Sequence, residues 1–417
     1  MTVEKIKSGS EHYFETNSNR KIIALWGSHR AEPARRGAEP TSVDKGVAEL
    51  ADRGMNVFSV YPSKFLRVLS KFMPQKAANR FAYIFACFYL MTKVQPADAL
   101  YTTDNAWANW IARLKRWGLL KNWLTFKWAG FDIDWSKVRS GGNPRERDFY
   151  GKILDQADIV FVISKHEMGI IGDVYPQNRQ KLRFWPTGVD LDFYRSVRAA
   201  SRSNSGQFVA VGSDKKRDWN IVVKLAERGV PITILTEDAK ARQIVEDLGT
   251  SRPASLTIAY RVGLHHSAEI MAASSGLILA TYPNDRFSGA TTVGVAAALG
   301  VPLIIDDPYD LEAYGLVSGY SCQTFERGNV NSAFLALTQI QQDGNFAQKL
   351  SNNIQLIADT FHIREYADAL EQTFGNQGQV DARTKKRILA AAGIAMVMAA
   401  LAWILSDIAF FAALADG

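Results

Sequence analysis

Short apolar runs alternate with longer segments of helical spacing along most of the chain. In the first half the apolar runs cover residues 21–27, 55–62, 98–103, 123–130 and 158–164. Runs of this length, bounded by glycine or polar residues, are typical of buried parallel strands. The helical segments between them complete a β-α-β pattern, so we expect a doubly wound sheet in this half.

The same pattern starts again after residues 195–207, a polar stretch with few bulky apolar side chains that we interpret as a linker. The sequence then predicts strands at 208–213, 231–236, 256–261, 276–283 and 301–307 and helices at 218–229 and 290–300. The expected fold class is α/β, with two tandem Rossmann-like domains and a C-terminal membrane helix. The expected parts are a polar tail (1–20), two domains (21–195 and 196–360), a closing helix with a basic linker (361–387) and a membrane anchor (388–415).

Two such domains imply a ligand cleft at the carboxyl ends of the strands. The turns at Gly27 and Gly212, which follow the first strand of each domain, are expected on its two walls. Neither turn carries the full G-x-G-x-x-G fingerprint, which argues against a nicotinamide or flavin enzyme.

The expected anchor follows a basic segment, "RTKKR" (383–387). Residues 388–405 are uncharged and long enough for a short membrane span. Basic residues beside a span stay on the cytoplasmic side, so we expect the body of the protein at the cytoplasmic face of the plasma membrane. A buried or interfacial hairpin is the alternative, because Asp407 is costly inside a bilayer.

Charge is concentrated in one part of the chain. The net charge is +7, and between residues 63 and 131 the only acids are Asp98 and Asp104. The basic residues of this region are Lys64, Arg67, Lys71, Lys76, Arg80, Lys93, Arg113, Lys115, Arg116, Lys121 and Lys127. Many aromatic residues lie among them, a combination that favours an anionic membrane surface. No nucleic-acid motif is present, so we expect no nucleic-acid partner.

The segment "DIVFVIS" (158–164), followed by "KLRFWPTGVDLDFY" (181–194), resembles the glycosyltransferases of GT-B fold. The resemblance extends over about residues 21–375. It implies that Gly188 and Asp190 form the last turn of the first domain and face the cleft. It also implies a nucleotide-diphosphate sugar as donor substrate, with no cofactor and no metal.

Two loops of the second domain are expected to bind the donor. A basic loop after its first strand contains Gly212, Ser213, Lys216 and Arg217, and backbone amides with a guanidinium suit a diphosphate. The alternative is a solvated turn in which Asp218 caps the next helix. The second loop leads into an alanine-rich helix and contributes Asp285, Ser288, Gly289, Thr291 and Thr292. Tight packing of that helix is its structural alternative.

The second loop departs from the family pattern. The resemblance implies two glutamates eight positions apart, where this chain has Phe287 and Val295. Asp285 is a partial replacement for the first. Recognition of the ribose by the second glutamate, and membership of the retaining group, are therefore open.

The first domain is expected to hold the acceptor. The loop 27–40 is similar to that of the membrane-associated glucuronosyltransferases of xanthan assembly, which implies that His29, Arg35 and Arg36 meet an anionic, lipid-linked acceptor; a surface loop is the alternative. Inverting transfer needs a base for the acceptor hydroxyl. Asp132, Asp134 and Asp104, near strand ends, are the candidates, with a helix cap or solvated turn as alternative roles. His29 is a further candidate catalytic residue.

Together these features predict a membrane-anchored glycosyltransferase that transfers a sugar from a nucleotide-diphosphate donor to a lipid-linked or lipid acceptor in the assembly of a bacterial surface polysaccharide or exopolysaccharide. Two alternatives stay open. A degenerate transferase without activity would bind a partner at the membrane, and a nucleotide-sugar epimerase would use the same architecture.

Overall fold

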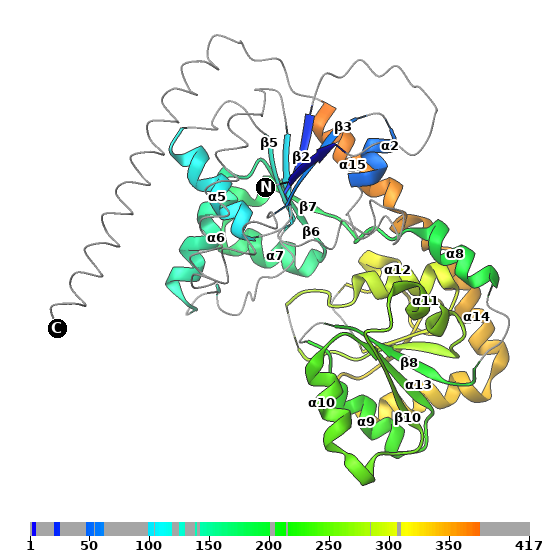
Figure 1. The fold of residues 1–417 in the computed structure, drawn as a ribbon. Helices are drawn as coiled ribbons and strands as arrows, with labels where there is room; N and C mark the ends of the chain where they lie inside the picture. The colour runs from blue at the N-terminus through cyan, green and yellow to red at the C-terminus, as the bar shows by residue number, and fades with distance from the viewer. Residues whose placement is uncertain are drawn as a thin grey trace.

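The computed structural model describes residues 2–5, 21–25, 47–53, 55–61, 99–103, 105–118, 125–129, 138–139, 142–200, 205–213, 216–283, 285–306 and 310–375. These residues form two α/β domains, each built on its own sheet (Figure 1). The expectation of two tandem Rossmann-like domains is therefore confirmed.

The first domain has a seven-stranded sheet in the order β1-β3-β2-β4-β5-β6-β7. All neighbouring strands are parallel except β1, which pairs antiparallel with β3 at the edge. The strands are β1 (Thr2–Lys5), β2 (Lys21–Leu25), β3 (Asn56–Tyr61), β4 (Ala99–Thr102), β5 (Thr125–Ala129), β6 (Ile159–Val162) and β7 (Leu182–Phe184). Its helices are α2 (Val47–Asp52), α5 (Asn105–Arg116), α6 (Pro144–Gln156), α7 (Lys165–Val174) and the 3₁₀ helix η3 (Pro176–Lys181).

The second domain has a six-stranded, fully parallel sheet in the order β10-β9-β8-β11-β12-β13. Its strands are β8 (Phe208–Val211), β9 (Ile232–Thr236), β10 (Leu256–Tyr260), β11 (Gly276–Leu279), β12 (Leu303–Asp306) and β13 (Gln323–Phe325). Its helices are α8 (Leu191–Ala200), α9 (Trp219–Glu227), α10 (Ala239–Asp247), α11 (Leu264–Ala272), α12 (Ala290–Leu299), α13 (Val330–Gln342) and α14 (Gly344–Gln355), with 3₁₀ helices η4 (Gly249–Ser251), η5 (Glu312–Tyr314) and η6 (Ala358–Phe361).

Side chains on the two faces of the second sheet pack into two separate hydrophobic layers. On β11, Leu277 and Leu279 pack with α8, α11 and α12, whereas Ile278 packs with α9 and α13. Successive side chains of a strand point to opposite faces, so a continuous apolar strand must be covered on both sides. This explains why these strands read as uninterrupted apolar runs in the sequence.

The chain crosses between the domains twice. Val189, just after β7, is fully buried in the core of the second domain. Helix α15 (Ile363–Gly375) crosses back, and its Ile363, Ala367 and Leu370 join the core of the first domain. Figure 1 shows α15, in orange, beside α2 in blue. The expected closing helix therefore exists, and it covers the first domain.

Two boundaries differ from the sequence prediction. Residues 2–5 form an edge strand within the segment expected to be a polar tail. The expected linker at 195–207 is helical up to Ala200, because Leu191, Tyr194 and Val197 make one apolar face that packs on the second domain.

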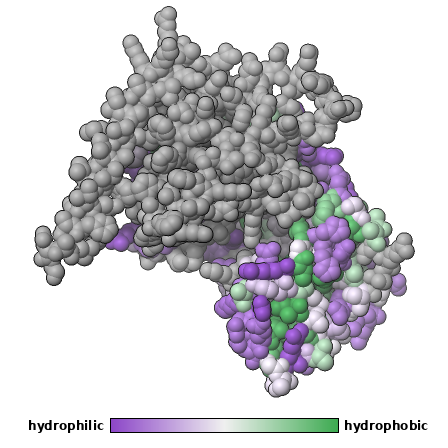
Figure 2. Space-filling model, viewed as in Figure 1, coloured by the Kyte–Doolittle hydropathy of each residue, from purple (hydrophilic) through white to green (hydrophobic). Residues whose placement is uncertain are grey.

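The expected anchor (388–415) and the basic residues Lys64, Arg67 and Lys71 lie outside the described residues. Within the described part of the chain, no helix is long and apolar enough to span a bilayer. On the visible face of the second domain, hydrophilic residues surround a smaller hydrophobic area (Figure 2). Exposed apolar side chains such as Leu335 and Leu356 are ordinary on a folded domain.

Candidate functional site

The order of strands in the second sheet reverses between β8 and β11, which are adjacent although two strands separate them in the chain. In open parallel sheets, ligands bind beyond the carboxyl ends of the strands at such a switch point. The loop after β8 leads to Arg217, and the loop after β11 leads to Ser288 and Gly289. The two loops predicted to bind the donor therefore meet at the switch point.

Arg217 joins the two loops. Its backbone forms an antiparallel bridge with Thr281, and the flanking bonds run from Tyr282 N to Lys216 O (2.8 Å) and from Asp218 N to Ala280 O (3.0 Å). Its side chain is 6% exposed, and Nη1 donates to the carbonyl of Ser288 at 3.4 Å. A buried guanidinium thus lies beside the start of α12.

Gly212 allows this position of Arg217. A Cβ at residue 212 would lie 1.9 Å from Nε of Arg217, a distance no side chain can occupy. The Gly212 carbonyl accepts a 2.6 Å bond from the Thr236 hydroxyl, which fixes the turn after β8. The glycine is therefore needed for the arginine to pack over the backbone.

The first turn of α12 faces the same place. Gly289 precedes the helix with φ 111°, and Val293 N makes the first helical bond to its carbonyl at 3.1 Å. The amides of the first turn have no partner within the helix, and the macrodipole favours an anion there. Ser288 and Thr292 are buried beside this turn, and Thr291 is exposed. A guanidinium, a helix N-terminus and hydroxyl groups suit a diphosphate.

A buried carboxylate that the sequence reasoning missed lies at the end of β12. Asp306 is 1% exposed, and its Oδ2 accepts bonds from Thr281 N (2.9 Å), Thr281 Oγ1 (2.7 Å) and Arg327 Nε (2.9 Å). It therefore holds both the strand end that pairs with Arg217 and a second arginine. Its place at the end of a predicted apolar strand was the available signal.

The other predicted donor residues lie at the rim. Ser213 is exposed, and its hydroxyl accepts from Glu237 N at 3.3 Å. Lys216 is half-buried. Asp218 caps α9 by accepting from the amides of Asn220 and Ile221, as the alternative interpretation of this loop predicted.

Asp285 pairs with Arg139 of the first domain at 2.9 Å, an arginine that no sequence signal identified. The positions where the resemblance implies glutamates are occupied by core residues. Phe287 is 2% exposed and stacks on Tyr314 with ring centroids 4.2 Å apart, and Val295 is 4% exposed in the same cluster. These two side chains face the hydrophobic core, so any ribose contact must come from other residues.

The Gly188–Asp190 turn forms the crossover between the domains. Val189 N donates to Phe361 O (2.7 Å), and Ile363 N donates to Val189 O (3.0 Å), so the two crossovers are bonded to each other. Asp190 accepts from Phe193 N at 3.1 Å at the start of α8. Gly188 is buried. The turn ends the first domain, as expected, and its backbone is hydrogen-bonded to the second crossover.

The remaining predicted site residues lie outside the described part of the chain: Gly27, His29, Arg35, Arg36, Asp104, Asp132 and Asp134. In the part of the chain that is described, no group of three or more His, Cys, Asp or Glu side chains suits a metal ion.

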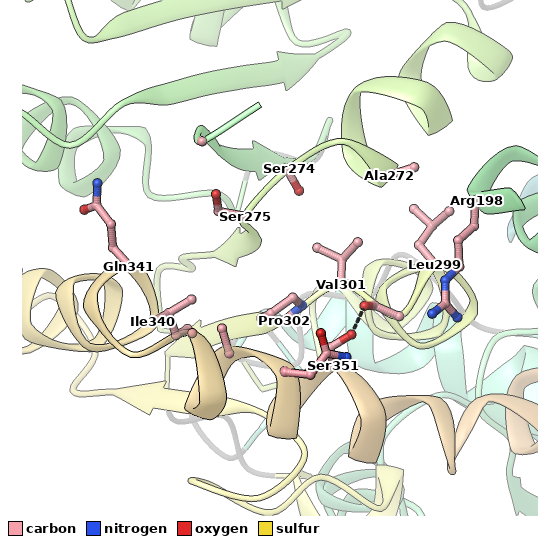
Figure 3. A pocket seen from close by; sticks show the side chains of 15 residues that line it. Arg198, Ala272, Ser274, Ser275, Leu299, Val301, Pro302, Ile340, Gln341 and Ser351 are labelled. Atoms are coloured by element: carbon pink, nitrogen blue, oxygen red, sulfur yellow. Dashed lines mark hydrogen bonds between the residues drawn. The ribbon is translucent and has the colours of Figure 1, made fainter. Parts of the chain in front are cut away.

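A cavity of about 700 Å³ lies elsewhere in the second domain, at the amino ends of the strands (Figure 3). Ser274, Ser275, Val301 and Pro302, which line it, directly precede β11 and β12. Because open parallel sheets bind ligands at the opposite edge, the switch point, and not this cavity, is the candidate functional site.

No protein-family model matches the chain, and no curated protein matches its sequence. Solved structures do match its fold. Sucrose-phosphate synthase from Thermosynechococcus elongatus superposes with a TM-score of 0.65 at 14% identity, over 85% of this chain and 98% of that one. Anabaena HepE in complex with UDP-glucose gives 0.61 at 12% identity, over 86% and 100%. WaaG, a glycosyltransferase involved in lipopolysaccharide biosynthesis, gives 0.59 at 12% identity, over 86% and 100%.

These neighbours are GT-B glycosyltransferases, and each is covered almost completely. Because the superpositions extend over 85–86% of this chain and so include both domains, the chain has the GT-B fold.

Proposed function

We propose that the protein is a glycosyltransferase that transfers a sugar from a nucleoside-diphosphate sugar to a lipid-linked or lipid acceptor in surface polysaccharide or exopolysaccharide assembly. The observation that carries the proposal is the convergence of buried Arg217 on the N-terminus of α12 at the switch point. The fold supports it, because structural neighbours were solved with UDP and glucose or with UDP-glucose.

The proposed role of these groups is to stabilise the negative charge that develops on the leaving diphosphate. Breaking the bond between sugar and phosphate leaves negative charge on the departing diphosphate. Donors fixed where that charge develops stabilise the transition state, since they need no reorganisation during the reaction. The amides of the α12 N-terminus, the Ser288 and Thr292 hydroxyls and the Arg217 guanidinium would serve in this way.

The acceptor side of the proposal rests on the sequence. Asp132 or Asp104 would act as base, with His29, Arg35 and Arg36 near the acceptor. All five residues lie outside the described part of the chain. A change of each aspartate to asparagine, with donor binding retained and transfer lost, would identify the base.

A groove between α5 and α6 supports a membrane setting. Arg113, Arg116, Arg145 and Lys152 line a space of about 480 Å³ with Trp117, whose side chain is 60% exposed. Its one acid, Asp148, is paired with Lys152. Lys115 faces away, because it is buried and bonded to Asp158 at 3.1 Å.

Exposed cations beside an exposed indole suit an anionic lipid surface. Trp107, by contrast, is core. We therefore propose that the reaction takes place at the cytoplasmic face of the membrane, a proposal that the basic segment before residues 388–405 also supports.

A panel of nucleoside-diphosphate sugars tests the proposal. A true donor should raise the melting temperature, and at 100 times its dissociation constant the stabilisation is about 2.7 kcal/mol. Incubation with acceptor lipids should consume the donor and release nucleoside diphosphate. Binding without consumption would favour the degenerate transferase, and conversion to a free or nucleotide-linked epimer would favour the epimerase.

A further inference from the structure

Tyr314 occupies a closed aromatic pocket between the domains. It is 3% exposed, stacks on Phe287 (4.2 Å, 17°) and on Phe361 (5.7 Å, 21°), and meets Phe184 edge to face (5.8 Å, 85°). Its hydroxyl donates a 2.5 Å bond to the carbonyl of Ile163 in the first domain. Burial raises the pKa of Tyr314 well above its usual value, so the hydroxyl stays protonated and remains a donor.

A second contact lies four residues earlier in the same segment. Asp310, 5% exposed, accepts from the Ser164 hydroxyl and from His166 N (3.1 Å) at the start of α7. The Ser164 hydroxyl also accepts a bond from Glu167 N at 3.0 Å, so it caps α7 and at the same time donates to the Asp310 carboxylate. A carboxylate at a helix N-terminus is stabilised by the amides and by the macrodipole. Residues 310–314 are therefore bonded to the first domain by two buried groups.

The donor loop is joined to this segment through one ring. Phe287 directly precedes Ser288 and Gly289, and it stacks on Tyr314. We propose that Tyr314 is a positioning residue that fixes the donor loop against the first domain, with Asp310 anchoring the same segment. Movement of Ser288 relative to the first domain would then strain the Phe287–Tyr314 stack and the bond to Ile163, together with the partly exposed Asp285–Arg139 ion pair of the same loop.

The kinetic consequence rests on the proposed function. Binding of a nucleoside diphosphate uses groups of the second domain, whereas transfer needs the two domains in a fixed relative position. Loss of the Tyr314 hydroxyl should therefore leave the dissociation constant of UDP within about twofold. It should lower kcat by about 10- to 100-fold, since small misplacements of reacting groups have effects of that size.

Paired variants test this. Tyr314→Phe removes only the hydroxyl, and Tyr320→Phe is its control, because Tyr320 is 48% exposed in the same region. Asp310→Ala removes the second contact, and Glu312→Ala is its control, since Glu312 is exposed two residues away. Amide hydrogen exchange, UDP calorimetry and donor turnover would be measured on each full-length variant.

We expect faster exchange of the His166 amide in Asp310→Ala, with the Glu167 amide protected as in the parent because its Ser164 cap remains. Tyr314→Phe should lose kcat but not UDP affinity, and both controls should match the parent. Parental exchange in Asp310→Ala, or parental kcat in Tyr314→Phe, would overturn the inference. Absence of UDP binding in the parent would instead refute the proposed function, and the exchange data would still decide whether Asp310 holds α7.

Discussion

Replacement of Arg217 by Met removes the guanidinium while keeping a side chain that fills the space over Gly212. The 3.4 Å bond from Nη1 to Ser288 O puts the guanidinium beside the start of α12, so we take a separation of about 4 Å between this charge and a bound phosphate. At an effective dielectric constant of about 20, two unit charges at that distance interact by about 4 kcal/mol. That value is an upper limit for what the charge contributes.

Arg217→Met should weaken both the binding of UDP and the turnover of the donor. A charge-assisted hydrogen bond contributes about 1.5–3 kcal/mol, so we expect UDP affinity to fall by about 10- to 100-fold. Turnover should fall further, by about 100- to 1000-fold, because charge on the diphosphate grows in the transition state. Arg217→Lys keeps the charge without the planar fork and should lie between the parent and Met.

Calorimetry with UDP and initial rates of donor consumption measure the two effects. Arg242→Met is a matched control, because this arginine is about half exposed on α10 and pairs with Glu246. Unfolding midpoints would verify that each variant is folded. A Met variant that binds UDP and turns over within threefold of the parent would refute the assignment of Arg217 to the diphosphate.

Three further predictions follow from single features. Gly289→Ala should lower the free energy of unfolding, measured in urea titrations, by about 1–3 kcal/mol more than Gly263→Ala does. Both glycines precede a helix with positive φ, but only at Gly289 would an added Cβ lie 2.4 Å from a neighbour, Leu279 Cδ2. Equal losses of stability would contradict this prediction. In a Cys87→Ser background, Cys322 should resist a thiol reagent at pH 8 until the protein unfolds, since burial raises its pKa to about 12; rapid labelling of the native protein would show the thiol accessible. In a protein truncated at Gly375, the double change Arg113→Glu and Arg116→Glu should weaken binding to anionic vesicles and reduce its salt dependence. The control Lys224→Glu with Lys240→Glu, at exposed positions of the second domain, should change neither. Equal effects of the two pairs would mean that vesicle binding depends on net charge and not on the groove.

The sequence predicted the sheet architecture well, because buried parallel strands are continuous apolar runs. It predicted the ends less well. Residues 2–5 are polar, and an antiparallel edge strand needs no apolar pattern to pair with β3. The predicted linker, 195–207, includes the second half of α8, although Leu191, Tyr194 and Val197 repeat every three residues and indicate a helix.

The sequence predicted candidate site residues only where polar residues stand in a loop directly after a predicted strand. The loops with Arg217 and Ser288 were found in this way, and the structure brings them together. The ion pair of Asp285 with Arg139 joins residues far apart in the chain, and no local pattern encodes it. Gly289 was expected to be part of the donor-binding loop, but its positive φ and the closeness of Leu279 to an added Cβ already require glycine. Folding and binding can select the same residue, and the sequence does not separate the two reasons.

Hydrogen exchange with and without saturating UDP tests the central claim most directly. The account predicts that UDP slows exchange of the first amides of α12, Ala290 to Thr292, and of the segment around Gly212 and Arg217. Exchange at the wall of the cavity at the amino ends of the strands, around Ser274 and Ser275, should be unchanged (Figure 3). Protection at that cavity with none at α12, or no protection anywhere, would contradict the account.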